Sequence, residues 1–330
     1  MGSLRDLLLM FDYDAIIVGG GPAGLTAGIH LARARYRVLV LEKEQFGGQL
    51  KNIAWIENYP GFQEGVGGPQ LASAMIEQAT QAGVELELRE VTGIESFSSC
   101  RSVTCADGRG YTAAVILVAA GCRPKELPLA DTERFRNKGI IHCALCEGGL
   151  FKDLIVAICG GGDSGVIEAL YLLKLASKVI VIEALPELQA EAVLQERLRA
   201  NPKAEIHCGA MVTAIRGDRY VQEIDLLHTA SQQVETLKVD GILVAIGTEP
   251  NTQCLQDAVP LDPFGQISVG NQFETETPYI FAVGDIRAGS PRLIATAVGD
   301  GAAAAIAAQR ILQANGTDAQ ASGGAQGASA

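Results

Sequence analysis

Three features are scarce or missing in this sequence, and each absence excludes a class of protein. No apolar run approaches the roughly 20 residues that a membrane-spanning helix needs, so we expect no membrane as partner. Basic residues are outnumbered, 26 Lys and Arg against 38 Asp and Glu, and the net charge of −12 disfavours nucleic acid. A tetrahedral zinc site of the usual spacing is missing too, because a second CxxC or an HxxxH does not occur.

The beginning of the chain also lacks the pattern of a secretory signal. The apolar run 7–10 is too short for a signal h-region, and Asp6 and Asp12 flank it. We therefore expect a cytoplasmic protein, whose cysteines stay reduced unless they carry redox chemistry. The sequence has 8 cysteines, and for five of them we expect the role of small buried apolar residues: Cys100, Cys105, Cys159, Cys208 and Cys254.

The first strong motif is a glycine-rich turn between a strand and a helix. The apolar run Tyr13–Val18 predicts a buried strand, and a helix is predicted from Ala23 to Ala34. Between them, one glycine allows a tight turn, the second lets the backbone approach a pyrophosphate, and the third lets the helix pack against the strand. The next predicted strand, 37–41, ends on an acid that suits a ribose hydroxyl. This order predicts a dinucleotide site formed by Gly19, Gly21, Pro22, Ala23, Gly24 and Glu42.

The same pattern occurs a second time. A strand predicted over 154–159 leads into another glycine motif, and the acid again comes 23 residues after the first glycine. The second site is predicted to contain Gly160, Gly162, Asp163, Ser164, Gly165 and Glu183, with Gly247 at the crossing back to the first domain. Further helices are predicted at 69–83, 185–200 and up to 312, and short strands at 84–118, 204–246 and 279–285.

A single CxxC lies between the two glycine motifs. Cys143 and Cys146 have the spacing of a redox-active dithiol, and Glu147 follows directly. His142 precedes the pair, but adjacent side chains need not face each other. A dithiol between two dinucleotide sites predicts an enzyme that moves electron pairs between a cofactor and a disulfide.

Taken together, these motifs resemble those of the low-molecular-weight thioredoxin reductases. The resemblance implies an α/β fold of two Rossmann-type domains with the second inserted into the first: 1–122 and 247–314 for FAD, 123–246 with the CxxC, and a flexible tail at 315–330. It is carried by Gly19–Gly24, Gly47–Leu50, Glu57–Gly61, Cys143–Gly148, Gly160–Ser164, Phe281–Asp285 and Arg292–Gly301.

The resemblance also implies roles and partners. Cys146 is expected to face the flavin, Cys143 to attack the partner disulfide, and Glu147 to replace the usual acidic proton donor. The family implies a homodimer and a thioredoxin-like or other disulfide substrate. Beside the glycine motif, the FAD contacts carried over by position are Glu42, Gln49, Asn58, Gly121, Asp285 and Arg292.

One departure from the family concerns the second site. Where NADPH-dependent members carry a His-Arg-Arg run and a later Arg, this chain has Glu183, Ala184, Leu185 and Gln189. A 2′-phosphate near Glu183 would meet a repulsion of about 4 kcal/mol per charge pair at 4 Å and an effective dielectric of 20. We therefore expect that NADPH is not bound, and that Glu183 accepts the unphosphorylated ribose of NADH or of a second FAD.

Three assignments of the electron donor remain open from the sequence. NADH is favoured by the similarity of 183–198 to the flavoprotein subunit of alkyl hydroperoxide reductase. A second FAD would match the diflavin-linked disulfide oxidoreductases, and ferredoxin would match the ferredoxin-dependent flavin thioredoxin reductases. The alternative functions are a ferredoxin-dependent thioredoxin reductase and an NADH oxidase or peroxide-linked flavoprotein.

Overall fold

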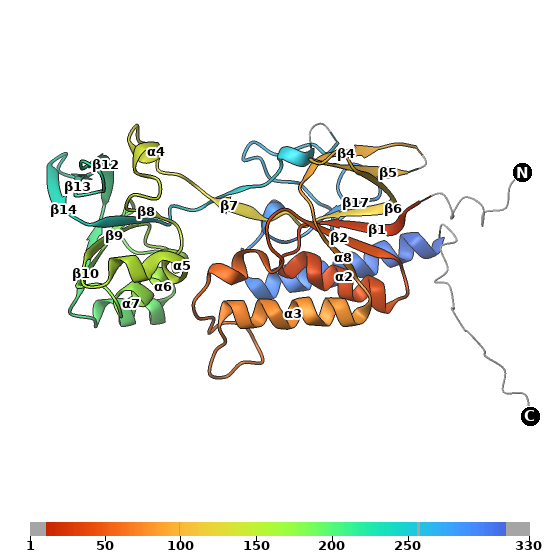
Figure 1. Ribbon diagram of the computed structural model, residues 1–330, viewed down its shortest axis with the longest axis horizontal. Helices are drawn as coiled ribbons and strands as arrows, with labels where there is room; N and C mark the ends of the chain where they lie inside the picture. Colours follow the sequence, from red (N-terminus) through yellow and green to blue (C-terminus); the bar gives the residue numbers. More distant parts are fainter. Residues whose placement is uncertain (1–10, 99, 256–257, 315–330) are drawn as a thin grey trace, which may run out of the picture. The chain divides into compact units, whose positions relative to one another are not determined.

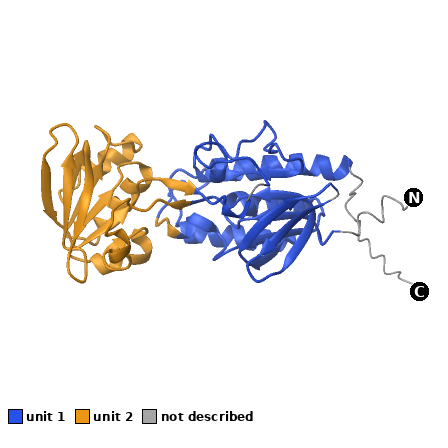
Figure 2. Ribbon diagram, turned by 90° about the horizontal axis from the view of Figure 1, so that it is seen from above, with its two compact units in different colours: residues 1–51, 55–122, 250–330 blue, residues 52–54, 123–249 orange. Residues whose placement is uncertain are grey.

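The chain folds into two compact units. The computed structural model describes residues 11–98, 100–255 and 258–314 (Figure 1), so the tail expected at 315–330 lies outside the described residues. Unit 1 comprises Met1–Lys51, Trp55–Cys122 and Pro250–Ala330, and unit 2 comprises Asn52–Ala54 and Arg123–Glu249 (Figure 2). Unit 2 thus interrupts the sequence of unit 1. The chain crosses between them on β7 (Cys122–Pro124) and β16 (Thr248–Pro250), which pair with each other.

Unit 1 is built on a seven-stranded sheet with the order β3-β2-β1-β6-β5-β4, and β17 pairs with β6. β1 lies parallel to β2 and β6, whereas β4, β5 and β6 form an antiparallel meander. The elements are β1 (Tyr13–Val18), α2 (Pro22–Arg33), β2 (Val38–Glu42), η1 (Gly48–Asn52), α3 (Gly68–Ala82), β3 (Glu85–Leu88), β4 (Val91–Ser96), β5 (Arg101–Cys105), β6 (Gly110–Val118), η3 (Gln253–Leu255), β17 (Ile280–Ala282), η4 (Gly284–Ile286) and α8 (Ile294–Ala314).

The layers of unit 1 follow from strands that are apolar on both faces. Ile16 and Ile17 are both fully buried, as expected for a central parallel strand. Helices α2, α3 and α8 cover one face of the sheet, and the β4–β5 ribbon lies over the other (Figure 1). The core under that ribbon contains Ile16 and Leu39 from the parallel strands and Ile94 from β4.

Unit 2 repeats this architecture. A five-stranded parallel sheet has the order β11-β10-β9-β15-β8, and a three-stranded antiparallel sheet has the order β12-β13-β14. The elements are α4 (Thr132–Phe135), β8 (Ile140–Ile141), α5 (Ala144–Glu147), η2 (Gly148–Phe151), β9 (Ile155–Cys159), α6 (Asp163–Leu172), β10 (Lys178–Glu183), α7 (Ala192–Arg199), β11 (Ala204–Cys208), β12 (Ala210–Arg216), β13 (Glu223–His228), β14 (Val234–Lys238) and β15 (Gly241–Val244). The parallel strands of the two main sheets, with the helices packed on them, confirm the predicted Rossmann-type α/β fold.

Two expectations about local structure were wrong. The helix predicted from 185 to 200 begins only at Ala192, because residues before it turn back and the N–H groups of Gln189 and Ala190 donate to the Gly161 carbonyl at 2.9 and 3.1 Å. Among the five cysteines expected to be buried, Cys100 and Cys208 are partly exposed.

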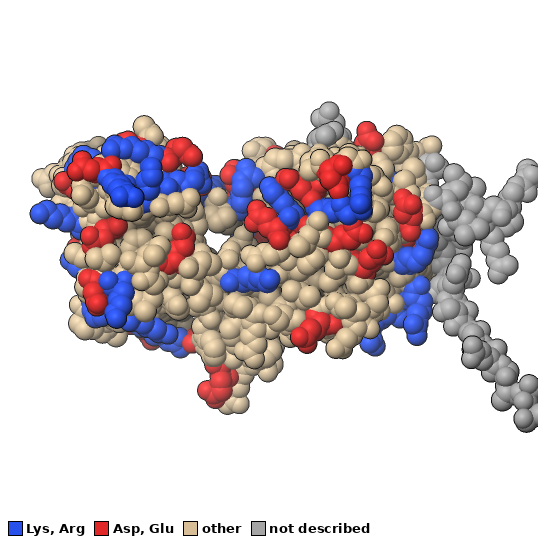
Figure 3. All heavy atoms as spheres, in the orientation of Figure 1, with Lys and Arg blue, Asp and Glu red and all other residues tan. Residues whose placement is uncertain are grey.

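The surface charge and the helices relate to the two partners disfavoured by the sequence, nucleic acid and membrane. On the face shown in Figure 3, Lys and Arg side chains are interspersed with Asp and Glu, so the net negative charge is not gathered there into one patch. Among the described residues, no helix is both long and apolar enough to span a bilayer.

Candidate functional site

The first glycine loop has space only where a ligand would need it. A Cβ on Gly19 would lie 2.3 Å from the Ala119 carbonyl oxygen, and one on Gly24 would lie 2.0 Å from the Gly19 oxygen. Both positions therefore require glycine, one for the turn and one for the close packing of α2 on β1. A Cβ on Gly21, in contrast, would meet no atom within 4 Å, so the loop is open at the N-terminus of α2.

Glu42 is held at the edge of this loop by backbone groups. Its Oε2 accepts a hydrogen bond from the Gly20 N–H at 2.8 Å, and its Oε1 accepts one from the Glu44 N–H at 3.2 Å. The chain after β2 then closes on the loop, where the Gly47 N–H donates to the Gly20 oxygen at 2.8 Å. These contacts fix the carboxylate in one position and leave each oxygen a further lone pair for a ribose hydroxyl.

The second loop repeats this geometry almost atom for atom. A Cβ on Gly160 would lie 2.1 Å from the Ala245 oxygen, whereas one on Gly162 would meet no atom within 4 Å. Glu183 Oε2 accepts from the Gly161 N–H at 2.6 Å, and Oε1 accepts from the Leu185 N–H at 2.8 Å. Glu183 thus occupies the place in unit 2 that Glu42 occupies in unit 1.

The residues around the first loop fit a dinucleotide such as FAD. The first turn of α2 contains no acidic residue and no side-chain cap, so its N–H groups are available to a pyrophosphate. In the second loop, the carboxylate of Asp163 accepts from the Glu191 N–H at 2.7 Å, and Ser164 is exposed beside it. The open glycine and the fixed acid are present in both loops, which is the arrangement that adenosine dinucleotides require.

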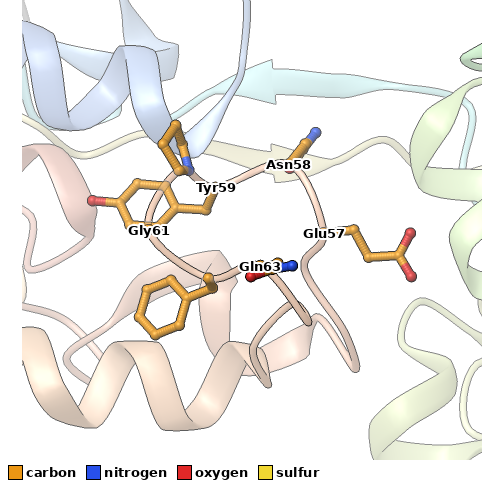
Figure 4. A pocket seen from close by; sticks show the side chains of 7 residues that line it. Glu57, Asn58, Tyr59, Gly61 and Gln63 are labelled. Atoms are coloured by element: carbon orange, nitrogen blue, oxygen red, sulfur yellow. The ribbon is translucent and has the colours of Figure 1, made fainter.

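The other predicted cofactor residues of unit 1 lie on loops. Gln49 Nε2 donates to the Cys122 oxygen at 3.2 Å, and Gly121, at φ +61°, accepts from the Asn251 N–H at 3.0 Å. Asn58 lies in the loop 57–63, which lines a cavity of about 510 Å³; its side chain points away from those of Tyr59 and Gln63 (Figure 4). In unit 2, Gly247 accepts from the Lys125 N–H at 3.0 Å beside the chain crossing.

Asp285 and Arg292 lie near each other at the N-terminal side of α8. Burial raises the pKa of Asp285, and the charge of Arg292 and a hydrogen bond with Ser290 oppose that shift. A residue pair that the sequence analysis missed holds this turn. Arg287 binds Asp300 through two hydrogen bonds, of 2.6 and 3.0 Å, and Asp300 Oδ2 also accepts from the Gly284 N–H at 3.1 Å.

The two cysteines of the CxxC form a disulfide. Cys143 and Cys146 have an S–S distance of 2.16 Å; Cys143 caps the N-terminus of the single turn α5, and Cys146 lies within that turn. The Cys146 N–H donates to Cys143 Sγ at 3.0 Å. Cys143 is only 7% exposed, whereas Cys146 is exposed. Glu147 ends α5, partly buried, with its N–H donating to the Cys143 oxygen at 3.1 Å.

Glu168 is a second acid at the dithiol, and the sequence analysis missed it. This residue lies on α6, and its Oε2 accepts from the N–H of Ala144, the residue after Cys143, at 2.6 Å. Loss of solvation raises the pKa of Glu168 to about 7, although the hydrogen bond from Ala144 acts in the opposite direction. A signal was available in the sequence, because Glu168 is the one acid in the otherwise apolar stretch 165–173 that follows the second glycine motif.

The neighbouring His142 has a different partner. Its Nε2 lies 3.3 Å from Glu126 Oε2, and Glu126 also accepts from Arg136 at 2.9 Å. His142 Nδ1 is buried and has no hydrogen-bond partner among the described residues. The contacts of His142 therefore lead to this exposed ion-pair network.

Comparison with known proteins agrees with this geometry. The family model for pyridine nucleotide-disulphide oxidoreductases matches residues 13–301. The thioredoxin reductase of Mycolicibacterium smegmatis is 37% identical over 301 residues, which cover 91% of this chain and 96% of that protein. The bifunctional thioredoxin reductase/thioredoxin of Mycobacterium leprae is 36% identical, and this chain spans 66% of its length. The crystal structure of Lactococcus lactis thioredoxin reductase (FR conformation) superposes with a TM-score of 0.90 at 34% identity, covering 92% of this chain and 100% of that one.

Proposed function

This chain belongs to the pyridine nucleotide-disulphide oxidoreductase family, and from that premise we propose that it passes electron pairs from FAD through the Cys143–Cys146 disulfide to a thioredoxin-like protein disulfide. It is a flavoprotein disulfide oxidoreductase of the thioredoxin reductase type. The observation that carries the proposal is a CxxC disulfide in a chain with two open dinucleotide loops.

We assign FAD to unit 1. When bound there, FAD would supply the two electrons that reduce the disulfide. The open backbone at Gly21 and the N-terminus of α2 would hold its pyrophosphate, and Glu42 would accept from its ribose. Further contacts are assigned to Gly19, Pro22, Ala23, Gly24, Gln49, Asn58, Gly121, Asp285 and Arg292.

The residues of the dithiol loop have separate proposed roles in reducing the partner disulfide. Reduction of the Cys143–Cys146 bond consumes two electrons and two protons, and yields two thiols. We assign Cys146 to the flavin side and Cys143 to the attack on the partner disulfide. The Cys146 N–H, 3.0 Å from Cys143 Sγ, would stabilise a thiolate on Cys143. Glu147 is the proposed donor of the proton to the leaving sulfur.

We propose that unit 2 binds an unphosphorylated adenosine dinucleotide, either NADH or a second FAD, and that NADPH is not the donor. Gly160, Gly162, Gly165 and Gly247 would surround its backbone, with Asp163 and Ser164 at the start of α6. The support comes from Glu183, a residue that is 9% exposed and whose carboxylate is fixed by two N–H groups, and from the loop 184–191, which contains no Lys or Arg. A 2′-phosphate would meet this charge, and the loop 184–191 supplies no guanidinium to offset it. We therefore assign the chain to an atypical branch of its family. As that family implies, we propose that it acts as a homodimer.

The proposal is tested by measuring bound flavin and then the donor. A ratio of flavin to polypeptide near two would identify the second FAD; a ratio near one with bleaching by NADH would identify NADH. Reduced ferredoxin is the third donor to mix, and bleaching by it alone would overturn the nucleotide assignment. Cys143→Ser and Cys146→Ser should each abolish reduction of a protein disulfide, while undiminished turnover in both variants would remove the dithiol from the reaction.

A further inference from the structure

Outside the nucleotide loops and the dithiol, two of the chain's four histidines meet in unit 2. His207 lies on β11 and His228 ends β13, with their ring centroids 6.0 Å apart. Glu235 on β14 joins them, and the ligand atoms offered by these three residues all lie within 4.8 Å of one another. We propose that His207, His228 and Glu235 form a binding site for one divalent transition-metal ion, of which Zn²⁺ fits best.

Backbone contacts hold the two imidazoles together. Gly209, at φ +66°, turns the chain from β11 directly into β12, and Ala210 on β12 pairs with His228. Thr229 then donates twice to the Gly209 oxygen, from its N–H and from its Oγ1, both at 2.8 Å. The positions of His207 and His228 are therefore set by folding, so these side chains lose little conformational entropy when a metal binds.

The ligand set selects the kind of metal. Two imidazole nitrogens and a carboxylate oxygen are borderline ligands, which suit Zn²⁺ better than Mg²⁺ or Ca²⁺. Bonds of about 2.0 Å to a tetrahedral Zn²⁺ put ligand atoms roughly 3.3 Å apart. The side chain of Glu235 is 47% exposed and has the freedom to close the remaining gap, whereas that of His207 is 15% exposed and fixed. Water would take the fourth position.

The surrounding charges also favour a cation. Glu205 Oε1 lies 2.6 Å from His207 Nε2, an arrangement in which a carboxylate orients a metal-binding imidazole. Glu235 Oε2 lies 3.1 Å from His228 Nε2. Among the described residues, the ion pairs of this cluster bring in one cation, Lys178, which pairs with Glu205, against the two carboxylates of Glu205 and Glu235. A divalent ion would balance this charge and tie β11 of the parallel sheet to the β13–β14 hairpin.

The test is Zn²⁺ binding by the flavin-loaded protein with the Cys143–Cys146 disulfide intact, measured by calorimetry at pH 7.5. We expect one Zn²⁺ per chain, and at least tenfold weaker binding in His207→Gln, in His228→Gln and in the exposed variant Glu235→Gln. The matched control is His30→Gln, an exposed histidine on α2, which should bind as the wild type does. Zn²⁺ should also raise the melting temperature of the wild type and not that of the His207 and His228 variants.

Co²⁺ distinguishes this site from the cysteines. Nitrogen and oxygen ligands give weak visible bands, and thiolate ligands add strong near-ultraviolet charge-transfer bands. Weak bands that disappear in His207→Gln would support the site. Thiolate bands, equal Zn²⁺ affinity in wild type and both histidine variants, or no binding at 1:1 stoichiometry would each overturn it. Because Glu235→Gln changes an exposed side chain, its result stands even if a histidine variant misfolds.

Discussion

The Oε2 atom of Glu168 accepts a hydrogen bond from the backbone N–H of Ala144 at 2.6 Å, so a carboxyl group whose pKa is raised to about 7 supports the turn that carries the disulfide. Its position within helix α6 is fixed, whereas α5 is a single turn. Two consequences follow for this pair. One concerns proton supply when the disulfide is reduced, and the other concerns stability as a function of pH.

Glu168→Gln tests the first consequence. Glutamine keeps an acceptor for the Ala144 N–H but cannot ionise, so the turn should stay in place. We expect the rate of protein-disulfide reduction by the wild type to change with pH around an apparent pKa near 7. In Glu168→Gln this pH dependence should be lost, while KM for the disulfide substrate stays unchanged. The measurement is kcat from pH 5.5 to 9. If Glu168→Gln leaves this pH dependence in place, Glu168 takes no part in proton supply, and Glu147, the donor proposed above, acts without it.

Glu168 should also make the free energy of unfolding depend on pH. Its pKa is raised from 4.5 to about 7 in the folded state, so the folded protein binds this proton more tightly than the unfolded chain does. Stability contributed by the protonated group is therefore full below pH 4.5 and is lost as pH rises towards 7, by up to about 3 kcal/mol for the 2.5-unit shift. Urea midpoints at pH 5 and pH 8 should differ less in Glu168→Gln than in the wild type. Glu196→Gln, an exposed acid on α7, should behave as the wild type does.

Sequence periodicity was sufficient for the parts of the fold that depend on local patterning. The strand Tyr13–Val18 was predicted with its bounds, because parallel strands buried on both faces are continuous apolar runs. The open glycines and the two acids also follow from the motif. The contacts of Glu168 with Ala144 and of Arg287 with Asp300 were not predictable, because they join elements whose packing no local pattern specifies. The late start of the expected helix, which leaves 185–191 outside it, has the same origin, since tertiary hydrogen bonds to Gly161 outweigh helix propensity there.

The first glycine loop provides a pair of substitutions with opposite outcomes. Gly21→Ala adds a methyl group to open space, so we expect the free energy of unfolding of the flavin-free protein to change by less than about 1 kcal/mol and FAD affinity to fall at least tenfold. Gly24→Ala places the methyl 2.0 Å from the Gly19 oxygen and should destabilise unit 1 itself. Urea denaturation and flavin titration measure both effects. Unchanged FAD affinity in Gly21→Ala would move the pyrophosphate away from this loop.

The buried pair Arg287–Asp300 should stabilise the turn that carries Asp285. The side chains are 15% and 7% exposed, and removing one partner leaves the other charge buried without compensation. We expect Asp300→Asn to lower the free energy of unfolding by about 3 kcal/mol and to weaken FAD binding, because Asp300 also holds the Gly284 N–H. Chemical denaturation with and without added FAD measures the two effects. If Asp300→Asn loses this stability but keeps its flavin affinity, the pair has only a structural role.

The last prediction concerns the charge at the second nucleotide loop. Glu183→Gln keeps a hydrogen-bond acceptor for the Gly161 or Leu185 N–H and removes the negative charge that would face a 2′-phosphate. We expect the ratio of NADPH to NADH affinity to rise at least tenfold, as measured by titration of the oxidised flavoprotein with each nucleotide. The matched control is Glu42→Gln, which makes the equivalent change in the first loop and should alter FAD retention but not this ratio. Because the two acids have the same backbone partners, any general effect of losing a carboxylate appears in both variants. If this affinity ratio rises only in Glu183→Gln, the discrimination against the 2′-phosphate is assigned to this one side chain. Equal ratios in the wild type, Glu183→Gln and Glu42→Gln would contradict the exclusion of NADPH by Glu183.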